Sequence, residues 1–229
     1  MKFSLGRRLC AEFVGTAFLL MAVVGSGIMG ERLSGGNAAI ALLANSLATG
    51  AALVTLILTF GPVSGAHFNP VVTLADAFTG GVARAEVAAY GLVQIAGAFA
   101  GTISAHFMFG LPAVTLSRHV RSGGAQFYSE IVATFGLIAM ILVCARLRPA
   151  GIPVAVGAYI TGAYWFTSST SFANPAVTVA RCITDTFAGI RPQDVAGFVV
   201  AQAAGAAAAV LMFRWLASGR ISAESGASL

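Results

Sequence analysis

Charge is scarce in this sequence, and its scarcity excludes most kinds of soluble protein. Only 9% of the 229 residues are charged, 58% are hydrophobic, and the mean hydropathy is +0.87. A soluble globular domain carries about 25% charged residues. The formal net charge of +5 comes from scattered residues rather than from a basic stripe, which excludes a nucleic-acid partner. The composition therefore predicts an integral membrane protein surrounded by the lipid bilayer.

Residues and motifs typical of metal, redox and catalytic sites are also sparse. The three cysteines, Cys10, Cys144 and Cys182, are odd in number and far apart, without a CxxC pair. This pattern argues against a disulfide framework and against a zinc site. The sequence has no HExxH motif and no credible Ser/His/Asp set, so an enzyme acting within the membrane is not expected. We predict no cofactor, no metal site and no catalytic residue.

The sequence contains long stretches without any charged residue. They cover residues 33–75, 87–117, 131–145 and 149–180. Because a membrane-spanning helix needs about 20 apolar residues, the two longest stretches contain more than one crossing, or a crossing and a re-entrant segment. The continuous apolar character favours helices over a β-barrel, whose strands alternate polar and apolar residues. We predict an all-α membrane protein with six transmembrane helices, over about residues 9–29, 38–60, 84–108, 126–147, 152–168 and 194–216.

The basic residues indicate the orientation of these spans. An even number of spans places both termini on one side of the membrane. The terminal side collects more lysine and arginine than the opposite side: Lys2, Arg7, Arg8, Arg84, Arg146, Arg148, Arg214 and Arg220, against Arg32, Arg118, Arg121 and Arg191. Because lysine and arginine favour the cytoplasmic side, both termini are expected in the cytoplasm.

The two halves of the chain resemble each other in three places. Glu12 and Thr16 in the first half match Glu130 and Thr134 in the second. The other matches are HFNPVVT with FANPAVT, and QIAGAFAG at 94–101 with QAAGAAAA at 202–209. Since each half has three spans, the halves lie in opposite orientations, as in the inverted repeats of many transport proteins. We predict one channel domain over residues 1–229, with repeats at about 8–110 and 126–217 and a disordered tail at 219–229.

Each half also carries an Asn-Pro pair inside oily sequence. Asparagine is a favoured N-cap and proline fits the first turn of a helix, so Asn69-Pro70 and Asn174-Pro175 each predict a helix start. The apolar residues that follow, to about residues 78 and 187, are too few to cross the membrane. We therefore expect two re-entrant half-helices that meet end to end at mid-membrane. Their positive N-terminal ends and the two amides repel cations and suit a neutral, hydrogen-bonding solute.

Three titratable residues accompany these pairs. Glu12 and Glu130 lie within spans, where an isolated carboxylate is costly. Either they accept backbone N–H groups of the re-entrant loops or they relay protons. His67, two residues before Asn69, is either a packing residue or in contact with the pore. We interpret all three residues as support for the pore and its loops.

The motifs SGAHFNPVVT and SFANPAVT, with the paired glutamates, resemble those of the aquaporin family of water and small-solute channels, the major intrinsic proteins. The resemblance covers about residues 8 to 217. It implies the hourglass fold, one pore per subunit and a homotetramer. The first box, Asn69-Pro70-Val71, departs from the family's usual Asn-Pro-Ala, whereas Asn174-Pro175-Ala176 follows it.

The family also has a narrow outer filter of four positions. Spacing from the boxes places these positions at Thr49, Gly162, Ser171 and Val177. Nearly all members have arginine where this chain has Val177, and water-selective members have phenylalanine and histidine where it has Thr49 and Gly162. The resemblance therefore implies a wider mouth without the usual fixed charge. Arg181, one helical turn after Val177, either restores a charge to the vestibule or pairs with Asp185.

This pattern resembles bacterial aquaglyceroporins associated with arsenic-resistance operons, in their rhizobial form. The resemblance implies a passive channel in the bacterial inner (plasma) membrane for arsenous acid, methylated arsenicals, glycerol-like polyols and water. One alternative is a water-selective channel or a general polyol facilitator. Another is a secondary carrier, because inverted repeats also build carriers. Only Asp76 and Asp185 lie close to the broken segments as ion ligands for a carrier.

Overall fold

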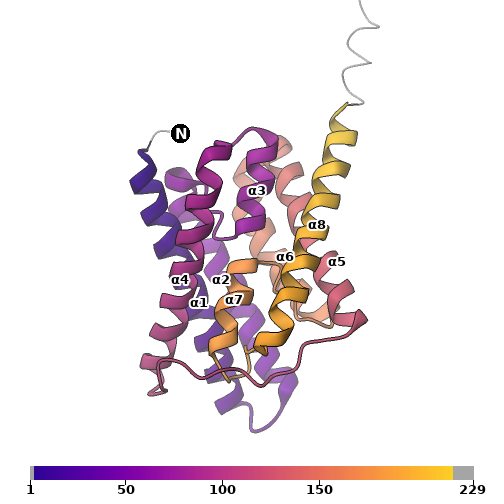
Figure 1. Cartoon of the computed structure of the whole chain (residues 1–229). Coiled ribbons are helices and arrows are strands. Elements are labelled where there is room, and N and C mark those ends of the chain that lie inside the picture. Colours follow the sequence, from indigo (N-terminus) through magenta and orange to yellow (C-terminus); the bar gives the residue numbers. More distant parts are fainter. Residues whose placement is uncertain (1–2, 219–229) are drawn as a thin grey trace, which may run out of the picture.

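The computed structural model describes residues 3–218, and all of the regular secondary structure in that range is helical. The predicted tail at 219–229 lies outside the described residues. Long helices run side by side, and the N-terminus and the end of the last helix lie at the same end of the bundle (Figure 1). The long helices are α1 (Leu5–Leu33), α2 (Ala38–Ser64), α4 (Val87–Met108), α5 (Gly124–Leu147), α6 (Ile152–Phe166) and α8 (Pro192–Ser218).

These six helices match the six predicted spans to within a few residues at each end. Five of them are long and apolar enough to cross a membrane by themselves. The sixth, α6, has 15 residues and directly follows the 3₁₀ turn η2 (Pro149–Gly151), which lengthens its helical run. A second 3₁₀ turn, η1 (Arg84–Glu86), opens α4 in the same way.

Small residues bring the helices of each half close together. Gly97 and Gly101 of α4 face the backbone of α1, where an added Cβ would collide with the Phe13 and Ala17 carbonyl oxygens. Gly205 of α8 meets the backbone of α5 at the Ile131 carbonyl in the same manner. Helices in a membrane associate by such close backbone contact because lipid provides no hydrophobic force between them. The pairs α1–α4 and α5–α8 therefore form two equivalent walls.

Two short helices begin in the middle of the bundle. They are α3 (Pro70–Thr79) and α7 (Pro175–Ala180), each with proline in its first turn. Figure 1 shows α3 in the half of the bundle nearer the N-terminus and α7 in the opposite half. The Asn69 side chain caps α3 through the Val71 N–H, and the Asn174 side chain caps α7 through the Ala176 and Val177 N–H groups. The Asn-Pro pairs therefore start two half-helices, as predicted.

The second half-helix is shorter than the sequence indicated. Instead of extending to about residue 187, α7 ends at Ala180 and continues only as the 3₁₀ turn η3 (Arg181–Ile183). The Cys182 and Ile183 carbonyls accept hydrogen bonds from Ser117 and Thr115 of the loop at 109–123. A longer α-helix needs these carbonyls for its own next turn, so pairing with the loop stops it.

Candidate functional site

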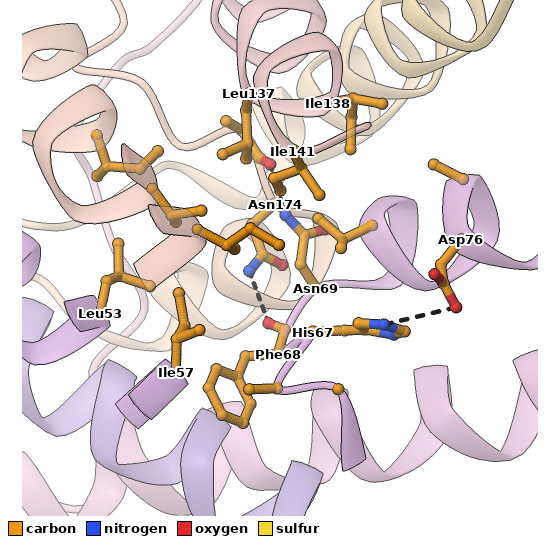
Figure 2. Close-up of a pocket in the computed structure, with 18 of the residues that line it drawn as sticks. Leu53, Ile57, His67, Phe68, Asn69, Asp76, Leu137, Ile138, Ile141 and Asn174 are labelled. Carbon is orange, nitrogen blue, oxygen red and sulfur yellow. Dashed lines mark hydrogen bonds and ion pairs between the residues drawn. The ribbon is translucent and has the colours of Figure 1, made fainter. Parts of the chain in front are cut away.

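The two asparagines meet at the centre of the protein. The Asn69 side-chain amide donates to the Ala173 carbonyl at 2.8 Å, and the Asn174 amide donates to the Phe68 carbonyl at 2.8 Å. Each amide oxygen meanwhile caps its own half-helix. Figure 2 shows both amides close together at one cavity wall. Each Nδ2 has a second N–H beyond the bond to the opposite loop, so two donors are available at this level.

Two buried glutamates secure the re-entrant loops through equivalent hydrogen bonds. Glu12 is fully buried and accepts the His67 and Phe68 N–H groups at 3.0 and 2.7 Å. Glu130, also fully buried, accepts the Phe172 and Ala173 N–H groups, both at 2.9 Å. A serine hydroxyl and a glutamine amide complete each set of four donors: Ser64 and Gln94 for Glu12, and Ser169 and Gln202 for Glu130. Four donors satisfy a buried carboxylate, so its cost within the membrane is offset locally.

The loops before the half-helices follow an unusual backbone path. Positive φ angles occur at Ala66 and Phe68 in the first loop, and at Ser171 and Ala173 in the second. Non-glycine residues rarely adopt these angles, and they persist only where neighbouring groups fix the backbone. The glutamate hydrogen bonds fix it here. These two loops contribute Gly65, Ala66, His67, Ser171 and Phe172 to the lining of one cavity, and among residues 3–218 no donor bonds the carbonyl oxygens of these five residues.

That cavity has a volume of about 590 Å³ and follows the axis between the two halves. Both asparagines and both loops line one side of it. Leu137, Ile138 and Ile141 of α5 form an apolar wall, and Leu53 and Ile57 of α2 extend it (Figure 2). A solute in this cavity therefore meets hydrogen-bonding groups on one face and hydrocarbon on the other.

Three of the four expected filter positions line one end of the cavity. They are Thr49 of α2, Ser171 of the second loop and Val177 of α7. Gly162 does not line it: the residue is exposed on α6, and an added Cβ would meet nothing within 4 Å. Tyr164 takes its place, with its hydroxyl 3.2 Å from the Thr49 hydroxyl. Two residues turn a helix by about 200°, so positions 162 and 164 face nearly opposite directions on α6.

Arg181 also lines this end and is only 2% exposed. Its guanidinium carbon lies 3.4 Å from the centroid of the Phe172 ring, and its Nε donates to the Ala188 carbonyl. Within the described part of the chain it forms no ion pair with Asp185, whose carboxylate accepts the Arg118 N–H at 2.9 Å. The structure therefore does not contain the predicted Arg181–Asp185 pair among the described residues, and the vestibule charge stays a prediction.

Arg121, in the loop at 109–123, contacts the same phenylalanine. Its guanidinium carbon lies 4.9 Å from the Phe172 centroid, and it donates to the Gly189 and Ser169 carbonyls at 2.7 and 3.2 Å. Burial lowers the pKa of Arg121 below its ordinary value, and the charge of Glu130 partly opposes this shift. Arg121 thus connects the loop at 109–123 to the loop that precedes α7.

The opposite end of the cavity carries a histidine and an aspartate. His67 Nε2 lies 3.7 Å from Asp76 Oδ2 (Figure 2), and His67 Nδ1 lies 3.1 Å from the Thr73 hydroxyl. Asp76 also accepts the Val82 N–H at 2.7 Å, which ties down the turn after α3. His67 is therefore both a packing residue and part of the cavity wall, which joins the two interpretations of its role.

His106 and the three cysteines are the other side chains considered for a chemical role. His106, buried in α4, contacts the Pro112 carbonyl and the Thr184 hydroxyl through its two ring nitrogens, at 2.8 and 2.7 Å. All three cysteines are free thiols. Between residues 3 and 218, no group of three or more potential metal ligands occurs.

Sequence reasoning missed Tyr164 and Arg121. The sequence does contain a pattern that indicates Tyr164: Val156, Ile160 and Tyr164 recur every four residues, which is the spacing of one helix face, and all three line the cavity. No sequence pattern indicates Arg121, because its contacts with Ser169 and Gly189 lie 48 and 68 residues away along the chain. Only the folded loop brings these groups together.

Comparisons with known proteins agree with this geometry. The family model described as Major intrinsic protein matches residues 1–161. The aquaglyceroporin AqpS of Rhizobium meliloti (strain 1021) is 54% identical over 215 residues, covering 94% of this chain and 92% of that protein. Aquaporin NIP3-1 of Oryza sativa subsp. japonica is 33% identical over 164 residues, covering 69% of this chain and 52% of the plant protein.

The fold has a counterpart among solved structures. The X-ray structure of the aquaglyceroporin from Plasmodium falciparum has a TM-score of 0.73 at 21% sequence identity, covering 93% of this chain and 95% of that one. At this identity the likeness concerns the fold alone, and it confirms the predicted helical membrane architecture. Together with the family match and the 54% identity, it establishes that this multi-pass membrane protein belongs to the major intrinsic protein family, whose members are channels and not enzymes.

Proposed function

We propose that this protein is a passive channel for small neutral solutes bearing several hydroxyl groups, with glycerol-like polyols, arsenous acid, methylated arsenicals and water in its range. The observation that carries the proposal is the two-sided cavity between the half-helices. Loop carbonyls and the Asn69 and Asn174 amides exchange hydrogen bonds with solute hydroxyls, while the leucine and isoleucine wall accommodates C–H or methyl groups. Neutral solutes with one polar and one apolar face match this arrangement.

The filter in this proposal consists of Thr49, Tyr164, Ser171 and Val177. Valine at position 177 leaves the constriction without a guanidinium, which widens the range of solutes beyond water. Arg181 provides the fixed positive charge at this end of the pore instead. Together with the asparagine amide donors, it opposes the entry of cations.

The orientation of the channel, its membrane and its oligomeric state are proposed from separate observations. Arg84, Arg146, Arg148 and Arg214 lie at the ends of spans on the side of the bundle that carries the N-terminus, which supports a cytoplasmic location of both termini. The similarity to a Rhizobium protein favours the inner membrane of a bacterium. Exposed apolar residues on α1, α2 and α4, such as Phe18, Leu47 and Leu92, suit either lipid or neighbouring subunits, and we propose a homotetramer.

The function is tested by stopped-flow measurements on proteoliposomes that contain the purified protein. We expect water, glycerol and arsenous acid to cross faster than in protein-free liposomes, and methylated arsenicals to cross measurably. Asn69→Asp and Asn174→Asp place a carboxylate at the centre and should lower solute flux. Glycerol and arsenous acid rates equal to those of empty liposomes, with rapid water flow, would favour the water-selective alternative.

A further inference from the structure

The end of the cavity at Arg181 has an unused capacity for hydrogen bonding. Arg181 is 98% buried within the protein, and only its Nε has a protein acceptor, the Ala188 carbonyl. Its Nη1 and Nη2 donate to no residue in the range 3–218, yet both retain contact with the cavity that Arg181 lines. Buried charged groups are normally paired, so a guanidinium with two open nitrogens requires a partner from the cavity.

No carboxylate of the described chain is available to neutralise it. Glu130 is surrounded by its four donors. Asp194 accepts two hydrogen bonds from the Arg191 side chain and one from the Arg121 N–H. Asp185, which accepts the Arg118 N–H, is exposed. Arg121 adds a second positive charge at the same ring, because both guanidinium groups contact Phe172.

We propose that this end of the pore, at Arg181, is a binding site for a small monoanion with at least two oxygen atoms. The two terminal nitrogens of a guanidinium form a planar fork that matches two oxygens of one anion. The Phe172 ring holds the guanidinium in a fixed orientation, and the Ser171 hydroxyl, which has no partner among residues 3–218, lines the same cavity. An anion bound here occupies the solute path and slows neutral solutes, a consequence that rests on the proposed function.

The test uses methanesulfonate, a permanently ionised anion with three oxygens, and dimethyl sulfone, a neutral molecule of similar shape. Two readouts are measured on the purified native protein: the unfolding temperature in detergent, and glycerol flux in proteoliposomes. We expect methanesulfonate to raise the unfolding temperature and to slow glycerol, both saturably. Dimethyl sulfone and an equal concentration of sodium chloride should do neither.

Variants locate the site. Arg181→Gln should weaken methanesulfonate binding by about tenfold or more, the usual worth of a charge-assisted hydrogen bond. Arg118→Gln removes an exposed arginine of the outer loop and serves as the matched control with unchanged binding. If Arg181→Gln does not fold, Arg181→Lys keeps the charge without the fork and should bind more weakly than the native protein.

Three outcomes overturn the proposal: no saturable response of the native protein, equal responses to methanesulfonate and dimethyl sulfone, or full binding by both Arg181 variants. The unfolding measurement does not depend on transport. A native protein that binds methanesulfonate but passes no glycerol would therefore contradict the proposed function and leave the anion site standing.

Discussion

Replacing Val177 by arginine tests whether the absent guanidinium sets the solute range. Val177 lines the cavity and is 5% exposed, so a longer charged side chain there must enter the pore. A change of one small group in a close-fitting site discriminates between solutes by about 1–3 kcal/mol, or roughly 10- to 200-fold. We therefore expect glycerol and arsenous acid flux to fall at least about tenfold relative to water flux in Val177→Arg.

The same substitution should also destabilise the protein, because the new arginine lies close to the positive charge of Arg181. Residues 177 and 181 are one turn apart, about 6 Å along the axis. Two positive charges at that separation repel by about 3 kcal/mol at an effective dielectric constant near 20. Because total stability is commonly on the order of 5–15 kcal/mol, this repulsion should lower the unfolding temperature visibly. The double variant Val177→Arg with Arg181→Gln removes the repulsion and should recover most of the loss.

The assay is stopped-flow light scattering with water and glycerol gradients on the same vesicles, so that the ratio of the two rates is independent of protein yield. Val177→Met adds bulk without charge and separates size from electrostatics. Adding Thr49→Phe, which also removes the Thr49 contact with Tyr164, should narrow the pore further. A well-folded Val177→Arg protein with the native glycerol-to-water ratio would refute our assignment of the filter.

Three further predictions concern the loop anchors, the filter and the ion pair between Arg8 and Glu86. Glu12→Gln should leave two of its four donors without an acceptor and lower the free energy of unfolding by about 2–6 kcal/mol, and Glu130→Gln should do the same. Glu31→Gln, at an exposed position, should change it little, and equal unfolding temperatures for all three variants would contradict the loop-anchoring role. Gly162→His should leave the glycerol-to-water ratio unchanged while Tyr164→Ala raises it, and the opposite pattern would return the filter position to Gly162. Arg8 donates two hydrogen bonds to the Glu86 carboxylate, at 2.8 and 2.6 Å, and Glu86→Gln removes the charge of this pair, so its unfolding temperature should be lower than that of the native protein. Thermal unfolding of the two proteins side by side measures the difference, and equal unfolding temperatures would count against a stabilising role of the ion pair.

Membrane burial explains why so much of the fold could be predicted. The requirement for about 20 apolar residues per crossing left little freedom in placing the spans, and α2 begins at residue 38 and α5 ends at residue 147, as expected. Asn69 and Asn174 were equally informative, because an N-cap followed by proline marks a helix start whatever surrounds it. The spans and the two helix starts could thus be predicted from properties of nearby residues in the sequence.

Features that depend on contacts across the chain were less predictable. The end of α7 is set by Ser117 and Thr115, which lie more than 60 residues earlier in the sequence. Spacing from the boxes pointed to residue 162 of α6 without giving the direction in which that helix faces, whereas Tyr164 is the residue of this turn that lines the cavity. The partners of Arg181, Glu130 and Asp194 are likewise a property of the folded hydrogen-bond network, and no pattern in the sequence gives them.

The most direct test of the central claim is glycerol flux through the reconstituted native protein with every ion gradient abolished by ionophores. The asparagine-centred cavity predicts flux proportional to the glycerol gradient in either direction, unchanged by sodium or proton gradients and without ionic current. Glycerol movement that stops when the gradients collapse, or that runs against its own gradient, would show a coupled carrier and contradict the account.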